Sequence, residues 1–423
     1  MNSTAKILTA IMSVTLVTQC FSESKIIDSF DIKSFYSSYD NVLIPNAEGI
    51  NLKKGMNIYS YQSGYINNGK NLSVNYELKE NLNPDISKLE LNKLYVNYEN
   101  NIFSISFGKM TKTIGPSKNS IILSNNYPPL LMIDIFNKKP LRLWGSWRFE
   151  LTNLWLNEDR KDVSNPEVII LRADYKPVDI LNIGFTRVSE YGGDGRPNYK
   201  LWEYPKLLLG GEDNVPYSKY DGDGYGGYDI TLNLEKYFNS LDELKIYYQD
   251  IGTDLVAPWQ KEDSGEWKFP FILKRSRQAG VEIIKSSDTY NIEFTNINYY
   301  FYIHHIYWYE GYTYKGFSLG YPYGKDLNDI YFSHRHIFGS NAIKYKIGYM
   351  KQPVSEKANS KYSLEKYYIE AEYQKKIRNC FIIPYLRIER NNNKDTNPLP
   401  TLYRIVPENN TTTVLGLETK FIF

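Results

Sequence analysis

The chain has 423 residues, of which 15% are aromatic, and its mean hydropathy is −0.48. Past the N-terminus there is no uncharged apolar run of about 18 or more residues, which excludes a helical membrane protein, and aromatic residues this abundant need burial, which argues against disorder. The 50 Lys and Arg residues balance 48 Asp and Glu residues to a formal net charge of +2, so no net field favours nucleic acid as a partner.

Residues 1–22 have the pattern of an export signal. A lysine precedes a short apolar core, and a small-x-small cleavage pattern begins at Cys20. We therefore expect a signal peptide over 1–22, followed by a short periplasmic segment over 23–54. A lipidated Cys20 is the alternative, although the preceding Gln19 fits it poorly. Cleavage would leave Cys380 as the only cysteine, so stability would have to come from backbone pairing and burial.

From residue 55 to residue 423 the chain alternates apolar and polar residues with a period of two. In the last segment Leu415 and Leu417 share one face, and Gly416 and Glu418 share the other. One face stays polar over strands of about ten residues, Tyr and Phe gather near the strand ends, and the chain ends on a phenylalanine. This pattern predicts an all-β, transmembrane antiparallel β-barrel in the outer membrane of a Gram-negative bacterium, rather than a secreted sandwich or propeller.

The alternation predicts about 18 strands, an even number that places both termini in the periplasm. With this parity, the long connections lie outside the cell, at 157–166, 191–224, 253–276 and 300–311. In chain order the strands are expected at 55–66, 71–80, 90–98, 102–110, 141–156, 167–176, 180–190, 225–235, 243–252, 277–286, 289–299, 312–320, 328–337, 342–351, 363–375, 379–390, 399–406 and 411–423.

One connection, residues 111–140, is too long for the periplasmic end to which this count assigns it. It carries an apolar run with Ile121 and Leu123, followed by Asn125 and Asn126. A long segment with apolar side chains needs cover, so we expect these four residues to belong to a plug that partly fills the lumen.

Sites for metals or catalysis are not predicted. The four histidines occur as His304-His305 and His334-x-His336, and neither pair has a third ligand at a convincing spacing, so no metal and no cofactor is expected. No nucleophile-elbow pattern is present, so we do not expect an enzyme.

The outward connections interleave aromatic rings with charged side chains. Sugars combine an apolar face of C–H groups with a rim of hydroxyls, so flat rings beside Asp and Arg suit a glycan. Arg196 could pair with an acidic sugar or brace its loop through Asp194. Aromatic residues at these positions could also be girdle residues at the membrane interface. The candidate glycan contacts are Asp194, Arg196, Trp202, Trp259, His305, Tyr307 and Trp308.

Several blocks between about residues 110 and 325 resemble, in the right order, the Wzi capsule-assembly proteins of Gram-negative outer membranes. They are Gly115-Pro116 with 120–126, the strand block 143–160, the glycine-rich loop 192–197, and the block that contains 304–307 and 311–316. The resemblance implies a monomeric eighteen-stranded barrel with a blocked lumen, a lectin that holds exported capsular polysaccharide at the cell surface. Family members commonly carry a helical bundle before the barrel, for which 23–54 leaves little room.

An outer-membrane porin or an exopolysaccharide export channel is the competing class. Both classes are barrels, so the fold cannot decide between them. A segment packed across the pore favours the lectin, whereas an open path lined by Lys344, Lys346 and Arg387 favours transport.

Overall fold

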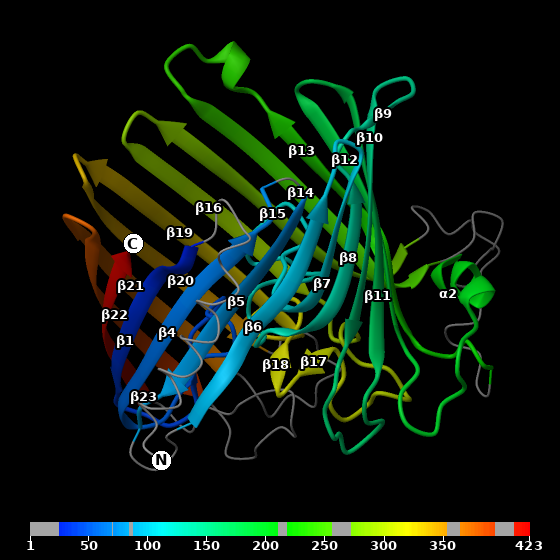
Figure 1. Cartoon of the computed structure of the whole chain (residues 1–423), viewed down its shortest axis with the longest axis horizontal. Helices are drawn as coiled ribbons and strands as arrows, with labels where there is room; N and C mark the ends of the chain where they lie inside the picture. The colour runs from blue at the N-terminus through cyan, green and yellow to red at the C-terminus, as the bar shows by residue number, and fades with distance from the viewer. Residues whose placement is uncertain are drawn as a thin grey trace.

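The computed structural model describes residues 25–69, 71–83, 88–209, 218–255, 272–352, 364–393 and 410–423. These residues form one large antiparallel sheet that closes on itself (Figure 1). Closure is made by β1 (Lys25–Ser37), which pairs with β4 (Gly55–Asn67) on one side and with the last strand, β23 (Asn410–Ile422), on the other. The predicted signal peptide and Trp259 lie outside the described residues.

The sheet contains 19 strands, one of which, β9 (Leu141–Arg142), is a two-residue strand beside β10, so eighteen strands make the barrel wall. The other wall strands are β5 (Leu72–Asn81), β6 (Lys88–Glu99), β7 (Phe103–Met110), β8 (Leu130–Asn137), β10 (Ser146–Trp155), β11 (Glu167–Val178), β12 (Leu181–Tyr191), β13 (Asp223–Asn233), β14 (Glu243–Leu255), β15 (Ile272–Lys285), β16 (Asp288–Ile297), β19 (Leu327–Phe338), β20 (Asn341–Gln352), β21 (Leu364–Ile377) and β22 (Cys380–Asn393).

The remaining elements are short and belong to the connections. Among the described helices, none is both long and apolar enough to cross a membrane. The short elements are β2 (Val42–Leu43), β3 (Asn51–Leu52), β17 (Thr313–Tyr314), β18 (Phe317–Ser318), the helix α2 (Tyr204–Leu209) and the 3-10 helices η2 (Leu201–Glu203) and η3 (Glu235–Tyr237).

The two faces of the wall differ as the alternation predicts. In β21 the outward Tyr367 and Ile369 are 47% and 50% exposed, whereas Tyr368 between them points into the barrel and is 1% exposed. In β23, Leu415 and Leu417 are likewise exposed on the outside. An apolar outer face with polar groups inside is the arrangement that lets a strand cross a bilayer.

The predicted number of strands is confirmed. Two wall strands were missed, however, and two of the predicted segments are not wall strands of the described structure, so the total is unchanged. β1 and β8 are wall strands that the alternation missed, so 23–54 is not a periplasmic segment and the barrel begins at Lys25 rather than at residue 55. Both strands also carry apolar side chains on the inner face, such as Phe35 and Met132, which hides the period of two. The predicted strand 312–320 holds only β17 and β18, and 399–406 lies outside the described residues.

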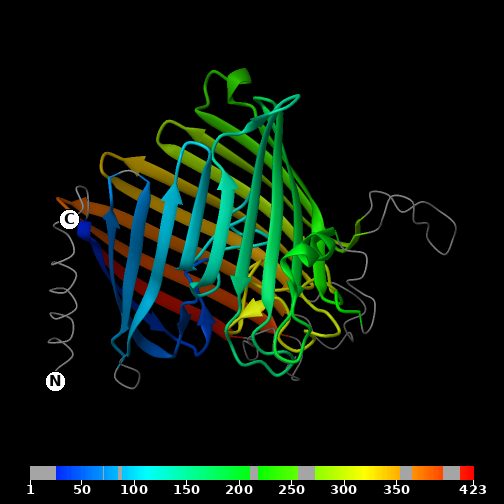
Figure 2. The same ribbon diagram turned by 45° about the vertical axis from the view of Figure 1, so that its right-hand side comes forward.

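The two ends of the barrel differ in the length of their connections (Figures 1 and 2). Lys25 and Phe423 lie together, since Lys25 Nζ donates to the Phe423 carbonyl at 2.9 Å. The short turns share this end, which is periplasmic by parity, and the long connections leave the opposite, extracellular end. With β1 and β8 counted, the connection between β7 and β8 moves from the predicted periplasmic end to the extracellular end.

That connection, residues 111–129, is called the plug segment below, and it reaches across the barrel. It leaves the wall between β7 and β8, which stand far from β15 and β16 in the order of the sheet. Asn119 nevertheless accepts a hydrogen bond at its carbonyl from Gln278 of β15 at 2.9 Å, and its side chain donates to Glu293 of β16 at 3.1 Å. The plug segment therefore lies in the lumen.

The plug segment is held from three sides. Ile121 and Leu123 are fully buried. The Asn126 side chain donates to the Ser318 carbonyl at 3.3 Å, and the carbonyls of Asn125 and Asn126 accept hydrogen bonds from the amides of residues 48 and 49 at 2.9 and 3.0 Å. The connections 38–54 and 298–326 thus pack with the plug segment inside the extracellular end of the barrel.

We expect that replacing residues 112–128 with a short Gly-Ser linker will raise single-channel conductance in planar bilayers. Met110 and Leu130 are paired neighbours, so a short linker can close the β7–β8 hairpin without loss of a wall strand. Heat-modifiable gel migration of both proteins controls for folding. Open-porin conductance in the unaltered protein would contradict a blocking role.

Candidate functional site

Three extracellular connections contact one another at the extracellular end of the barrel: 156–166, the described residues of 192–222, and 298–326. One carboxylate oxygen of Asp162 accepts hydrogen bonds from the amides of Tyr309 and Glu310, both at 2.9 Å. The first and third connections are therefore joined at the apex of the third. We call these three connections the loop platform.

Arg160 is the central tie of the loop platform. Its side chain is fully buried, and it donates to Glu158 at 2.8 Å, to Glu190 of β12 at 2.9 Å and to the Gly311 carbonyl at 3.2 Å. Burial alone would lower the pKa of the guanidinium, but the carboxylates of Glu190 and Glu158 outweigh it and raise the pKa. Sequence reasoning did not single out this role for Arg160, because its partners lie on three separate segments.

Arg196 braces the loop platform, although not through Asp194. Its guanidinium donates to the backbone carbonyl of Asp221 at 2.6 Å. Asp194 instead accepts a hydrogen bond from the Asn165 side chain at 3.0 Å, which joins 192–222 to 156–166. Asp194 is exposed, so its carboxylate can still meet a ligand.

Tyr307, a predicted glycan contact, is buried in the structure. It is 0% exposed, and its hydroxyl donates to the Gly192 carbonyl at 2.9 Å. Burial raises the pKa of its hydroxyl well above the usual value, so the group stays a neutral donor. The connection 298–326 folds inward, which turns this ring into a packing residue.

Two predicted aromatic residues do face solvent. Trp202, on η2, is 73% exposed with Lys200 Nζ 5.2 Å from its ring centroid, and Trp308 is 63% exposed. The Trp308 ring meets Tyr309 edge to face at 5.4 Å, and Lys161 Nζ lies 4.3 Å from the centre of the Tyr309 ring. The two indoles thus lie on different connections, Trp202 beside the cation of Lys200 and Trp308 beside a tyrosine ring that itself carries the cation of Lys161.

A cluster of tyrosines in 192–222 was not predicted as a site. The rings of Tyr199 and Tyr220 lie 5.8 Å apart, and Tyr199 and Tyr204 lie 6.3 Å apart. Lys206 Nζ lies 4.3 Å from the centre of the Tyr220 ring, and Lys219 Nζ lies 5.4 Å from that of Tyr199. The high density of Tyr and Lys in this stretch was the signal that could have identified it.

His305 lies beside an acid from another connection. Its Nε2 is 3.0 Å from one carboxylate oxygen of Asp221, and Nε2 of His304 is 3.6 Å from the other. The missing third partner of the His304-His305 pair is therefore Asp221, which spacing could not reveal because it is 84 residues from His305. At the opposite end of the barrel, His334 and His336 bind Asp288 at 2.6 and 2.8 Å.

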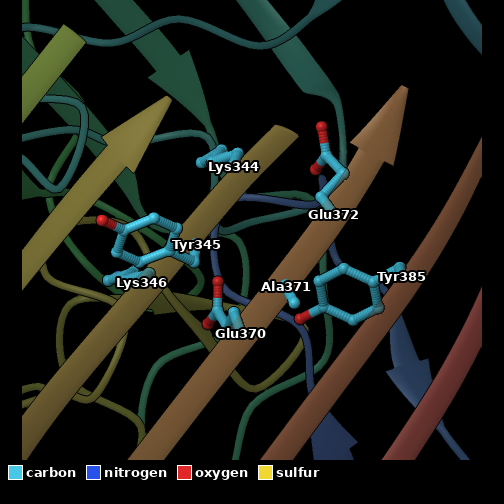
Figure 3. Close-up of a pocket in the computed structure, with 7 residues that line it drawn as sticks. All are labelled: Lys344, Tyr345, Lys346, Glu370, Ala371, Glu372 and Tyr385. Atoms are coloured by element: carbon cyan, nitrogen blue, oxygen red, sulfur yellow. The ribbon is translucent and has the colours of Figure 1, made fainter. Parts of the chain in front are cut away.

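The inner wall carries a separate small hollow on β20, β21 and β22 (Figure 3). Lys344, Lys346 and Glu370 are among its lining residues. Arg387, which would line an open path in the transport alternative, is fully buried and paired with Glu370 and Glu389, each at 2.5 Å. This hollow is not part of the loop platform.

A closed antiparallel wall with an apolar outside, polar inner groups and both termini at the short-turn end defines an outer-membrane β-barrel. Residues 34–395 match the family of the capsule assembly protein Wzi, and the chain therefore belongs to that family. This membership agrees with the sequence resemblance and with location in the outer membrane of a Gram-negative bacterium.

Three individual proteins are informative comparisons. The structure of Escherichia coli Wzi, described as a carbohydrate-binding β-barrel involved in group 1 capsule assembly, matches with a TM-score of 0.67 at 18% identity and covers 99% of this chain and 88% of that one. Pseudomonas aeruginosa OprD matches with a TM-score of 0.53 at 8% identity over 94% of each chain. A 55.8 kDa protein from the cps region of Klebsiella pneumoniae is 25% identical over 160 residues, which are 36% of this chain but only 30% of that relative.

We expect Arg160→Ala to loosen the loop platform, because it leaves the buried Glu190 carboxylate without its cation. Removing one partner of a buried ion pair costs roughly 3–5 kcal/mol. The temperature of the heat-modifiable transition should fall, and limited proteolysis should cut faster within 298–326. Arg335→Ala, an exposed arginine near the periplasmic end of β19, is the control. Equal proteolysis of the two variants would refute the role of Arg160.

Proposed function

We propose that this protein binds exported capsular polysaccharide without catalysis and holds it at the cell surface through the loop platform. The observation that carries the proposal is the pair of exposed indole rings, Trp202 and Trp308, on two connections that are tied to the barrel. Membership of the Wzi family supports it, as does the carbohydrate binding described for Escherichia coli Wzi.

The ties of the loop platform suit this role. Asp162, Arg160 and Arg196 fix the connections before a ligand arrives, so less conformational entropy is lost on binding. Asp194 and His305 supply exposed polar groups. The Arg196 guanidinium already donates one hydrogen bond to the Asp221 carbonyl. Trp259 stays a proposed contact from the sequence.

Affinity should come from repetition along the polymer. One sugar stacked on one ring is worth about 1 kcal/mol by analogy with aromatic pairs. Several weak contacts on a linked chain add up through effective concentration. A single barrel with separate stacking faces can therefore act as a monomer that retains polymer while it ignores monosaccharides.

Transport through the lumen is the competing function, because a closed barrel wall is compatible with either function. The plug segment opposes it, because hydrogen bonds join it to β15 and β16 across the lumen. The conductance measurement described for the plug segment separates the two functions.

We expect Trp202→Ala and Trp308→Ala each to weaken retention of purified capsule on immobilised protein several-fold, and the double variant to weaken it further. Trp144→Ala is a matched control, since Trp144 is 89% exposed but lies in the β9–β10 turn at the periplasmic end. Monosaccharides should not compete at concentrations where polymer does.

Arg196→Ala distinguishes a brace from a sugar contact. If less of the Arg196→Ala variant folds, but the folded fraction still retains capsule, Arg196 acts only as a brace of its loop. If the unaltered protein retains no capsule from its own cell, or if all the tryptophan variants retain polymer equally, the lectin function of these loops is wrong.

A further inference from the structure

We propose that Asp221, His304 and His305 form a binding site for a divalent transition-metal ion of the zinc class. The site joins the connection 192–222 to the connection 298–326. It does not depend on the proposed binding of polysaccharide, and the sequence alone predicted no metal here.

The geometry fits a tetrahedral ion. Zinc with bonds of about 2.0–2.1 Å to nitrogen and oxygen needs neighbouring ligand atoms roughly 3.3 Å apart. Asp221 oxygens lie 3.0 Å from His305 Nε2 and 3.6 Å from His304 Nε2. One ligand atom from each residue can be chosen so that all three lie within 4.8 Å of one another.

The Asp221 carboxylate is the second observation that points to a ligand. Asp221 is 3% exposed, and its Oδ1 atom accepts no hydrogen bond within the described structure. A buried carboxylate oxygen without a donor is costly, and a cation at this point would satisfy it. The ion would also offset the negative charge that burial makes expensive.

The proposed metal site is open to solvent on the side of His305. His304 is buried, whereas the side chain of His305 is 50% exposed. Three protein ligands with a solvent-facing fourth position is the pattern of open zinc sites, where water or another oxygen completes the coordination. Two imidazoles favour zinc, copper or nickel over calcium and magnesium, which prefer oxygen ligands.

Two neighbouring groups, the Ile306 amide and the Arg196 guanidinium, weaken the affinity of the site for a metal ion. The Ile306 amide donates to His304 Nδ1 at 3.3 Å, a contact that favours the tautomer with its proton on Nε2 in the metal-free protein. Zinc at Nε2 would shift this proton to Nδ1 and break a contact that is already long. The Arg196 guanidinium, bound to the Asp221 carbonyl, adds a repulsive charge nearby.

The test is zinc chloride titration of the full-length, tag-free protein in detergent after chelator treatment, read by calorimetry and by elemental analysis after dialysis. We expect one zinc ion per chain. His305→Ala and Asp221→Asn should each weaken binding by at least about tenfold, since each removes a ligand. Cobalt substitution should give the visible absorption of a tetrahedral ion in the unaltered protein, and this absorption should be lost in His305→Ala and Asp221→Asn.

His336→Ala is the matched control, because His336 belongs to the other His–Asp cluster, at the periplasmic end. It should leave zinc binding unchanged. Absence of saturable binding, equal binding by His305→Ala, or loss of binding in His336→Ala would each overturn the site. Since His305 is exposed, its alanine variant should fold, and heat-modifiable migration verifies this for every variant.

Discussion

The pairing of β1 with β23 is the contact on which the rest of the molecule depends. It joins the two ends of the chain through a continuous register from Ser29 opposite Ile422 to Ser37 opposite Val414. Inside a bilayer no water can satisfy the backbone groups of an open edge, so an unclosed sheet of this kind would not be stable there. Closure in turn creates a lumen, and what occupies that lumen decides what the barrel can do.

The occupants here are the molecule's own extracellular connections. The plug segment, 38–54 and 298–326 share a buried apolar core with the inner wall, and the approach is close. A side chain at Gly320 would place its Cβ atom 2.2 Å from both the Ile121 carbonyl oxygen and the Tyr302 hydroxyl. OprD shares the fold of the wall at 8% identity, so the wall by itself does not determine what such a barrel does.

The sequence predicted the wall well and the site only in part. Periodicity shows a strand when its two faces differ, as in β21 and β23. It fails where the inner face packs against an inserted connection, which is 38–54 for β1 and the plug segment for β8. The site depends on contacts between distant segments, such as Arg160 with Glu190 or His305 with Asp221, and periodicity carries no information about these. For the same reason the exposed Trp308 and the neighbouring buried Tyr307 could not be distinguished.

The hydrogen bonds of the plug segment also have a consequence for biogenesis. Asn119 and Glu293 are 174 residues apart in sequence, yet a hydrogen bond joins them at the inner face of the wall. The plug segment therefore cannot reach its native contacts until β15 and β16 have also taken their places in the wall. Contacts at such sequence separation make folding slow, because a large loop has to close first. The apolar stretch of the plug segment is thus covered late in the assembly of the barrel.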